Sequence, residues 1–179
     1  MKKLMIPLTI STYCIALFLI LAGALDERWP VYLWLASIAV SFVLSIANVF
    51  NAAAFKHNEE NIYRDSLIFK ILLIPFFIAN FILGILVAVT SIFSIFTLFF
   101  FASIPLAIIA LLMMVFAYWL MLSTSSYSIV LRLKNITIGK TPIKDLIIIV
   151  LHFIFVLDVI AAIILYRDYK KGVLYYEER

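Results

Sequence analysis

The feature that most constrains this chain is its series of long, unbroken apolar runs. One extends from Leu4 to Leu25, and another, from Ile68 to Leu131, contains a single charged residue, Lys70. A helix that crosses the hydrocarbon core of a membrane needs about 20 apolar residues. The strands of a membrane barrel would instead alternate apolar and polar residues, and these runs do not. We therefore expect an all-α fold, a polytopic transmembrane helical bundle.

The composition favours the same class of protein. Hydrophobic residues make up 66% of the 179 residues and charged residues only 13%, against roughly 25% charged residues in a soluble domain. The net charge of +4 comes from Lys and Arg residues that flank the apolar runs, as basic residues do at the cytoplasmic face of a membrane. We expect the lipid bilayer to be a partner of this chain and nucleic acid not to be one.

We expect residues 1–179 to form a single transmembrane domain with five spans. A sixth span is the alternative, because an 11-residue apolar piece, Ile92–Ala102, separates two weak breaks in the longest run. That piece is too short to cross a core of about 30 Å. It should form a short re-entrant or interfacial helix at about residues 91–103, or else extend the span before it. The expected spans cover residues 4–25, 31–55, 67–89, 105–131 and 146–166.

The basic residues indicate the orientation of the N-terminus. Lys2 and Lys3 precede an apolar run that is longer than the 7 to 15 residues of a signal-peptide core. We interpret it as the first span of a plasma-membrane protein, with the N-terminus in the cytoplasm. Counting basic residues leaves the side of the C-terminal tail open, because five and six spans both give nine inside and five outside. Lys70 should extend toward the membrane surface from the start of the third span.

Four small polar residues recur along the second expected span at spacings of four, four and three. Residues at these spacings share one face of a helix. Membrane helices pack closely through small and hydroxyl-bearing side chains. We therefore predict a helix-packing face, with lining of a substrate path as the alternative. Its members are Ser37, Ser41, Ser45 and Asn48.

Asp158 lies near the middle of the fifth expected span. A carboxylate at that depth costs about 2.5–3.5 kcal/mol, so it must face the bundle and find partners. The small Ala161 and Ala162 beside it would let another helix approach. Asp158 is either a proton or cation site or a hydrogen-bond clamp, and a clamp should tolerate Asp158→Asn. The polar residues expected near it in depth are Asn80, Ser41, Ser45 and Tyr118.

The histidines and the single cysteine indicate no metal or cofactor site. His152 precedes Asp158 by six residues, which in a continuous helix places the two side chains about 120° apart around the axis. They should therefore not form a close pair. With only one other histidine, His57, and one cysteine, Cys14, the chain lacks a plausible metal-ligand set. We expect no metal, no cofactor and no catalytic residue.

The polar loop Lys56–Asp65 contains Glu59, Glu60 and, four residues after the second glutamate, Arg64. This E-E-x-x-x-R pattern resembles the first motif of the CAAX-processing or Abi-type membrane proteases, in which paired glutamates serve the attacking water. That family also supplies histidines in F-x-x-x-H and H-x-x-x-N motifs, and this chain has neither. An intramembrane hydrolase is therefore the least favoured interpretation.

Three apolar tracts are similar to tracts in small uncharacterised multi-pass membrane proteins of low-GC Gram-positive bacteria. They are Lys70–Phe77, Thr124–Ile129 and Phe153–Val159. The resemblance implies a multi-pass membrane protein and brings no activity with it. It would place Asp158 inside a family motif.

Three functions are compatible with these patterns. The first is a non-enzymatic plasma-membrane protein that acts through a membrane partner, as an accessory subunit, an immunity-type protein or a homo-oligomer. The second is a small proton- or cation-coupled transporter or channel that uses Asp158, and the third is the hydrolase. A polar lining that reaches Asp158 from both membrane faces would favour transport, whereas a sealed apolar core would favour the partner role.

Overall fold

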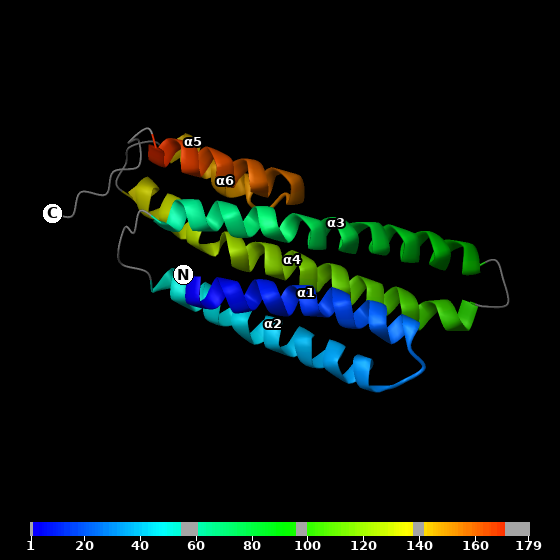
Figure 1. The fold of residues 1–179 in the computed structure, drawn as a ribbon. Coiled ribbons are helices and arrows are strands. Elements are labelled where there is room, and N and C mark those ends of the chain that lie inside the picture. Colours follow the sequence, from blue (N-terminus) through cyan, green and yellow to red (C-terminus); the bar gives the residue numbers. More distant parts are fainter. Residues whose placement is uncertain (1, 55–60, 96–99, 138–141, 171–179) are drawn as a thin grey trace.

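A computed structural model describes residues 2–54, 61–95, 100–137 and 142–170 of the chain (Figure 1). Within those ranges all regular secondary structure is helical, which confirms the all-α fold class. Six helices follow one another along the chain. They are α1 (Lys2–Ala24), α2 (Trp29–Ala53), α3 (Asn61–Ile95), α4 (Phe100–Thr137), α5 (Pro142–Leu151) and α6 (Phe155–Lys170).

Four helices, α1 to α4, are long and apolar enough to cross a membrane. Their backbone N–H and C=O groups pair within each helix, as an apolar environment requires. Pro30 stands in the first turn of α2, where the missing N–H of proline has no partner to lose. The candidate spans are Lys3–Ala24, Trp29–Ala53, Arg64–Ser91 and Ala107–Lys134.

The expected fifth span is not a single helix. The chain breaks at residues 152–154, where the backbone N–H groups of His152, Phe153 and Ile154 bond to carbonyls three residues earlier. The two pieces, α5 and α6, have 10 and 16 residues, or about 15 and 24 Å, and each is shorter than a core of about 30 Å. They fold back on each other as a hairpin against α3 and α4 (Figure 1). We call them the α5–α6 hairpin.

The prediction of a separate helix at about residues 91–103 is also wrong. Instead α3 continues to Ile95 and α4 begins at Phe100, so most of this piece extends the two long helices. The hydroxyls at the expected break do not end α3, because Thr90 donates its Oγ1 hydrogen to the Leu86 carbonyl of the same helix at 2.8 Å. A hydroxyl satisfied in this way is compatible with a continuous helix.

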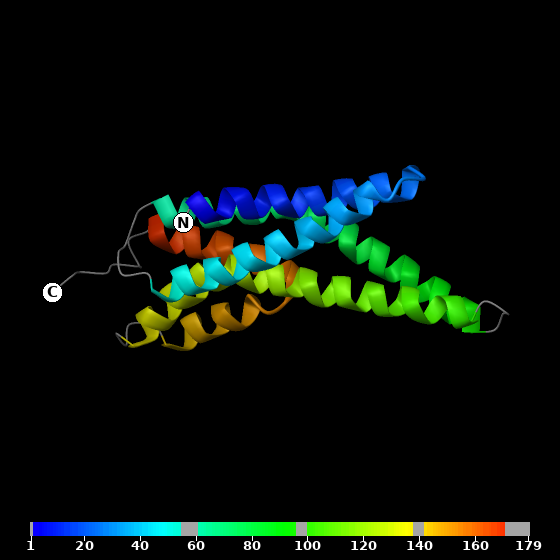
Figure 2. The same cartoon turned by 90° about the horizontal axis from the view of Figure 1, so that it is seen from below.

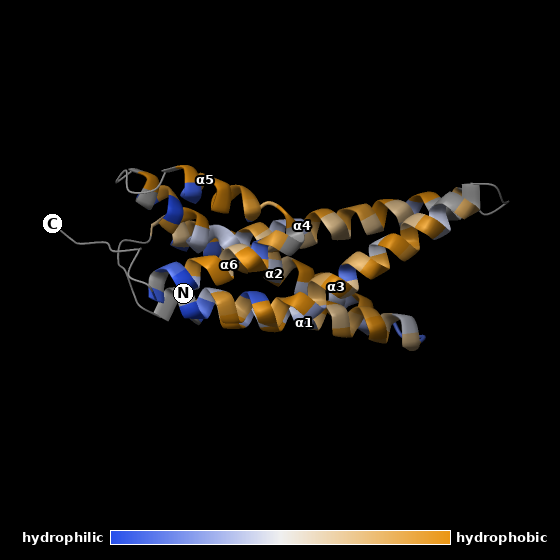
Figure 3. Cartoon of the chain, turned by 90° about the horizontal axis from the view of Figure 1, so that it is seen from above, coloured by the Kyte–Doolittle hydropathy of each residue, from blue (hydrophilic) through white to orange (hydrophobic). Residues whose placement is uncertain are grey.

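The helices pack as two pairs, α1 with α2 and α3 with α4, with α2 also contacting α4. The described basic side chains gather at the end of the bundle that holds the N-terminal end of α1, where Figure 3 shows hydrophilic residues. Arg28 alone among them stands in the turn at the opposite end. Lys70 is buried within the bundle, and the others are Lys3, Arg64, Arg132, Lys134, Lys144, Arg167 and Lys170. We call this the charged end.

At the other end, α3 and α4 extend past α1 and α2 and diverge from them (Figures 1 and 2). They have 35 and 38 residues, against 23 and 25 for α1 and α2. We call residues 86–95 of α3 and 100–107 of α4 the arm. Large apolar side chains of the arm are exposed, among them Leu86, Val89 and Phe93.

Candidate functional site

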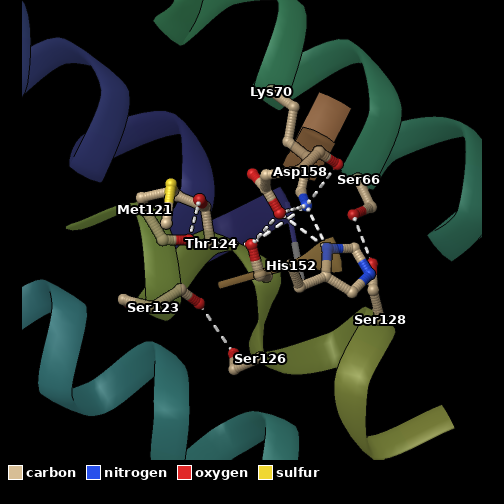
Figure 4. Close-up of polar contacts among 10 residues, drawn as sticks. Ser66, Lys70, Met121, Ser123, Thr124, Ser126, Ser128, His152 and Asp158 are labelled. Atoms are coloured by element: carbon tan, nitrogen blue, oxygen red, sulfur yellow. Dashed lines mark hydrogen bonds and ion pairs between the residues drawn. The ribbon is translucent and has the colours of Figure 1, made fainter. Parts of the chain in front are cut away.

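Four buried side chains meet where the α5–α6 hairpin inserts against α3 and α4 (Figure 4). They are Lys70 of α3, Ser125 of α4, His152 at the hairpin turn and Asp158 in the first turn of α6. Asp158 Oδ1 lies 2.5 Å from Lys70 Nζ, 2.6 Å from Ser125 Oγ and 2.6 Å from His152 Nδ1. One carboxylate oxygen therefore joins all three elements. We call these residues the Asp158 cluster.

Burial makes the charges of this cluster interdependent. Lys70 is 2% exposed and Asp158 3% exposed, and Ser125 and His152 are fully buried. An isolated charge at this position would be strongly disfavoured, whereas an ammonium and a carboxylate in contact compensate each other. Lys70 also donates to Ser125 Oγ at 2.9 Å, so the cationic head has neutral as well as anionic acceptors. The pair is neutral as a unit and fixes the hairpin to α3.

His152 gives the cluster a choice of proton positions. Its Nδ1 lies 2.6 Å from Asp158 Oδ1 and 3.1 Å from Lys70 Nζ. A protonated Nδ1 donates to the carboxylate, whereas an unprotonated Nδ1 accepts from the ammonium. The other ring nitrogen, Nε2, is buried and has no hydrogen-bond partner in the described part of the chain. The cluster can therefore hold a proton in more than one place without a change of fold.

Two sequence-based interpretations of these residues are wrong. Lys70 does not extend to the membrane surface, because its Nζ bonds to Asp158 in the interior. His152 and Asp158 do form a close pair, despite their six-residue spacing. The 120° separation assumed one continuous helix, and the break at residues 152–154 turns the two side chains toward each other.

The other predicted members of the polar site do not contact Asp158. Ser41 donates to Ser11 Oγ of α1 at 2.8 Å, and Asn80 donates to the carbonyl of Phe76 in its own helix at 3.1 Å. Ser45 accepts from the indole Nε1 of Trp119, which lies 2.6 Å from its Oγ. These residues lie along the bundle at other levels or on other helices than the Asp158 cluster.

Tyr118 contacts the hairpin but not its carboxylate. The hydroxyl of Tyr118 donates to the carbonyl of Phe153 at 3.2 Å. Phe153 belongs to the turn between α5 and α6, where carbonyls lack the regular helical partner. Tyr118 therefore supports the backbone of the turn.

The four residues of the predicted packing face, Ser37, Ser41, Ser45 and Asn48, are all buried. Asn48 Nδ2 donates to the carbonyl of Ser123 in α4 at 2.8 Å, and Ser123 Oγ donates to the carbonyl of Ser45 at 2.8 Å. With the Ser41 bond to α1, this face of α2 lies between α1 and α4. The side chains are small enough to let the two helices approach closely, so that side chains of each helix donate to backbone carbonyls of the other.

A second buried cluster closes the base of the hairpin at the charged end. Arg132 of α4 bonds to Asp145 of α5 through one guanidinium nitrogen and to Asp168 of α6, at 2.9 Å, through another. Lys144 reaches the same Asp168 oxygen at 2.8 Å. Burial alone would raise the pKa of Asp168, but its hydrogen bonds from Lys144 and Arg132 hold that pKa below the ordinary value. Arg132 therefore joins the two ends of the hairpin to α4.

Polar groups connect the two clusters, but only in the direction of the charged end. Ser66 of α3 and Ser128 of α4, whose Oγ atoms lie 3.3 Å apart, are one helical turn from Lys70 and Ser125 on the side of Arg132 (Figure 4). In the other direction the buried side chains of α3 and α4 in the described ranges are apolar. They are Leu73, Phe76, Phe77, Leu120 and Met121.

The hydrolase motif lies largely outside the described residues, because Glu59 and Glu60 fall in the segment 55–60. The side chain of Arg64 is 53% exposed and contacts Asp65 at 3.7 Å. Within the described ranges, no group of three His, Cys, Asp or Glu residues could hold a metal ion. Of the three motif residues, the structure therefore describes Arg64 alone, with its side chain largely exposed.

Residues 1–171 match the model of a family of unknown function, DUF6652, and the chain belongs to that family. Comparison with curated proteins and with solved structures found no match.

Proposed function

We propose that this DUF6652 protein is a non-enzymatic, multi-pass protein of the plasma membrane that acts through a membrane partner. The observation that carries the proposal is the arm, the apolar part of α3 and α4 that extends beyond α1 and α2. The buried clusters serve in this proposal to hold the α5–α6 hairpin in place. The four helices that are long and apolar enough to span support the membrane location.

The length of the apolar part of α3, which ends in the arm, is the physical argument for a partner. From Leu67 to Ile95, α3 has 29 residues, or about 43 Å, and its only charge is the paired Lys70. A hydrocarbon core is about 30 Å thick, and spanning helices tilt by 0–40°. Tilting alone would need an angle at or beyond the upper end of that range. A membrane partner that covers the arm would remove the mismatch.

The sealed state of the Asp158 cluster supports the same proposal. Ser66 and Ser128 lie beside it on the side of the charged end, and the described buried side chains of α3 and α4 between it and the arm are apolar. A transport pathway must be polar from both faces, at least in alternation. A neutral, hydrogen-bonded ion pair in the interior supports a structural role, in which it holds the α5–α6 hairpin against α3.

The distribution of basic residues supports the orientation. In this proposal the charged end, with the N-terminus, lies in the cytoplasm, and the turn that contains Arg28 lies outside. Basic residues at the ends of spanning helices accumulate on the cytoplasmic side. Four spans followed by a re-entrant hairpin give a much larger excess of basic residues on the cytoplasmic side than five or six spans do.

Crosslinking in living cells tests the partner role. A photoreactive amino acid replaces Leu86 or Phe93, which lie seven residues apart on one face of the arm and are 59% and 70% exposed. Both positions should give the same discrete protein adduct. Phe50, which is 71% exposed near the charged end, is the matched control and should give none. Two differently tagged copies of the chain distinguish a homo-oligomer from a different partner.

Lipid adducts alone at all three positions would refute the proposal. Equal protein adducts at Phe50 would also do so, because the arm would then have no special role. Neither outcome depends on the integrity of the Asp158 cluster.

Proton-coupled transport through Asp158 is a second candidate, favoured by one observation. His152, Asp158 and Lys70 share a buried contact at a helix break, and His152 Nε2 has no partner among the described residues. Buried Asp and His residues form proton relays in transporters. The purified protein in liposomes with an imposed pH gradient should then carry protons faster than Asp158→Asn. Equal leakage from both would eliminate this candidate.

A further inference from the structure

The imidazole ring of His152 lies at the contact between the α5–α6 hairpin and α3 (Figure 4). Its Nδ1 lies 2.6 Å from Asp158 Oδ1 of α6 and 3.1 Å from Lys70 Nζ of α3. The ring is fully buried. A change in the charge of this ring therefore acts directly on the contact between the hairpin and α3.

The contact with Asp158 determines which nitrogen carries the hydrogen of the neutral ring. An unprotonated Nδ1 would direct its lone pair at a carboxylate oxygen 2.6 Å away, whereas a protonated Nδ1 donates to that oxygen. The Nδ1–H form leaves Nε2 with a free lone pair. Nε2 is buried and has no hydrogen-bond partner among the described residues, so it can accept a further proton.

A second proton on the ring would oppose the attachment of the hairpin. Among the described residues, the charged groups that act on the ring are Lys70 of α3, Arg132 of α4 and Asp158 of α6. Asp158 already compensates Lys70, so a protonated ring would leave the buried cluster with a net positive charge. The new Nε2–H would also be buried without an acceptor in the described ranges, which is unfavourable.

Release of the hairpin turn from α3 removes both penalties. Once water reaches the ring, the imidazolium is hydrated and Nε2–H has an acceptor. A histidine in water takes up this proton with a pKa of about 6.5, so below that pH the released form binds one proton more than the attached form. Acidification then shifts the equilibrium toward the released form.

We infer that the Asp158 cluster is a proton-binding site that controls the attachment of the α5–α6 hairpin, with His152 Nε2 as the atom that takes up the proton. The inference rests on the proposed role of the cluster in holding the hairpin. It depends neither on a membrane partner nor on proton transport, so failure of the crosslinking or liposome experiments would leave it intact.

Amide exchange at the hairpin turn measures the attachment. The backbone N–H groups of His152, Phe153 and Ile154 bond to carbonyls three residues earlier, and they exchange when the turn opens. Dividing each exchange rate by that of an unstructured peptide at the same pH gives the opening constant of the turn. The full-length protein in lipid nanodiscs is measured between about pH 7.5 and about pH 5.5, where Asp and Glu side chains with ordinary pKa values near 4 stay ionised.

The opening constant of the wild-type protein should rise roughly tenfold from the upper to the lower end of this range. His57→Gln removes the other histidine and should show the same rise. His152→Asn keeps a side-chain N–H for Asp158 but has no group that titrates in this range. Its opening constant should therefore not change with pH.

NMR of isotope-labelled histidine in His57→Gln tests the inference even if His152→Asn does not fold. At neutral pH the hydrogen of the His152 ring should be on Nδ1, and Nε2 should be unprotonated. The inference would be overturned by a pH-independent opening constant in the wild type, by an equal rise in His152→Asn, or by a hydrogen on Nε2 at neutral pH.

Discussion

Replacing one partner of the buried pair should destabilise the protein far more than replacing both. Lys70→Met leaves the Asp158 carboxylate with Ser125 and His152 as its remaining polar contacts. Asp158→Leu, like Asp158→Asn, leaves a buried ammonium beside neutral groups. The sequence alone suggested that Asn would serve as well as Asp in a clamp, but the presence of Lys70 changes that expectation.

The magnitude follows from burial. Removing one member of a buried ion pair costs about 3–5 kcal/mol, because the other charge stays buried and uncompensated. For a chain of this size 1 kcal/mol corresponds to about 2–4 °C in Tm, so each single variant should lose about 6–20 °C. Replacing both with apolar residues of similar volume is often neutral.

In the double variant Lys70→Met/Asp158→Leu, the remaining loss of stability comes from neutral groups that have lost a hydrogen-bond partner. Ser125 keeps its bond to the Met121 carbonyl at 2.8 Å. His152 loses both polar partners of Nδ1, which costs about 1–3 kcal/mol. The double variant should therefore be no less stable than either single one, although additive costs would reach about 6–10 kcal/mol.

Thermal unfolding of the four proteins in one detergent measures this coupling. Asp26→Asn is the control, since it removes the same charge from an exposed turn and should change the free energy of unfolding by at most about 0.5 kcal/mol. A double variant that loses as much as the two singles together would show that Lys70 and Asp158 do not compensate each other.

Three further results are expected. The pKa of Asp168 is held below its ordinary 3.8, so its stabilising contribution is complete above about pH 5 and is lost as the pH falls through the lowered value. Tm should therefore drop more on acidification in the wild type than in Asp168→Asn, and parallel curves would contradict this. Ser41→Leu forces a large side chain between α2 and α1 and should cost about 1–3 kcal/mol, whereas Val43→Leu, at a position that is 64% exposed, should cost little. Equal melting temperatures of the two variants would refute the packing assignment. Tyr118→Phe removes the hydrogen bond to the Phe153 carbonyl and should cost about 0.5–1.5 kcal/mol. Amide exchange at the hairpin turn should become faster, and unchanged exchange would show that Tyr118 does not stabilise the turn.

The helical class and the first two spans could be predicted because they depend on local properties. Runs of about 20 apolar residues form helices wherever backbone groups must pair internally. The packing face of α2 could be predicted for the same reason, because helical periodicity alone places Ser37, Ser41, Ser45 and Asn48 on one side of the helix. These inferences need no knowledge of which helices are neighbours.

The α5–α6 hairpin could not be predicted from the same rules. Residues 146–166 have the length and hydropathy of a span, and no glycine or proline marks the break. What turns the chain back is a set of distant contacts, from Arg132 to both hairpin ends and from Tyr118 to the turn. Such contacts leave no periodic signal in the sequence.

The partners of Asp158 were missed for a related reason. In a helix that crosses the whole bilayer, Asp158 would lie at the depth of Asn80 and the α2 serines. The hairpin shifts Asp158 to the level of Lys70. A useful signal was present, because Lys70 is the only basic residue within the apolar part of α3, and one buried charge indicates that another must compensate it.

Labelling of single cysteines tests the central claim, that four spans are followed by a re-entrant hairpin. In a Cys14→Ser background the chain has no other cysteine, and Asp26→Cys, Ile143→Cys and Lys170→Cys then report on the outer turn and on the two ends of the hairpin. In intact cells a membrane-impermeant thiol reagent should label Asp26→Cys alone, and the other two should react only after the membrane is opened. Labelling of Lys170→Cys from outside would indicate five spans, labelling of Ile143→Cys would indicate six, and either result would contradict the re-entrant hairpin.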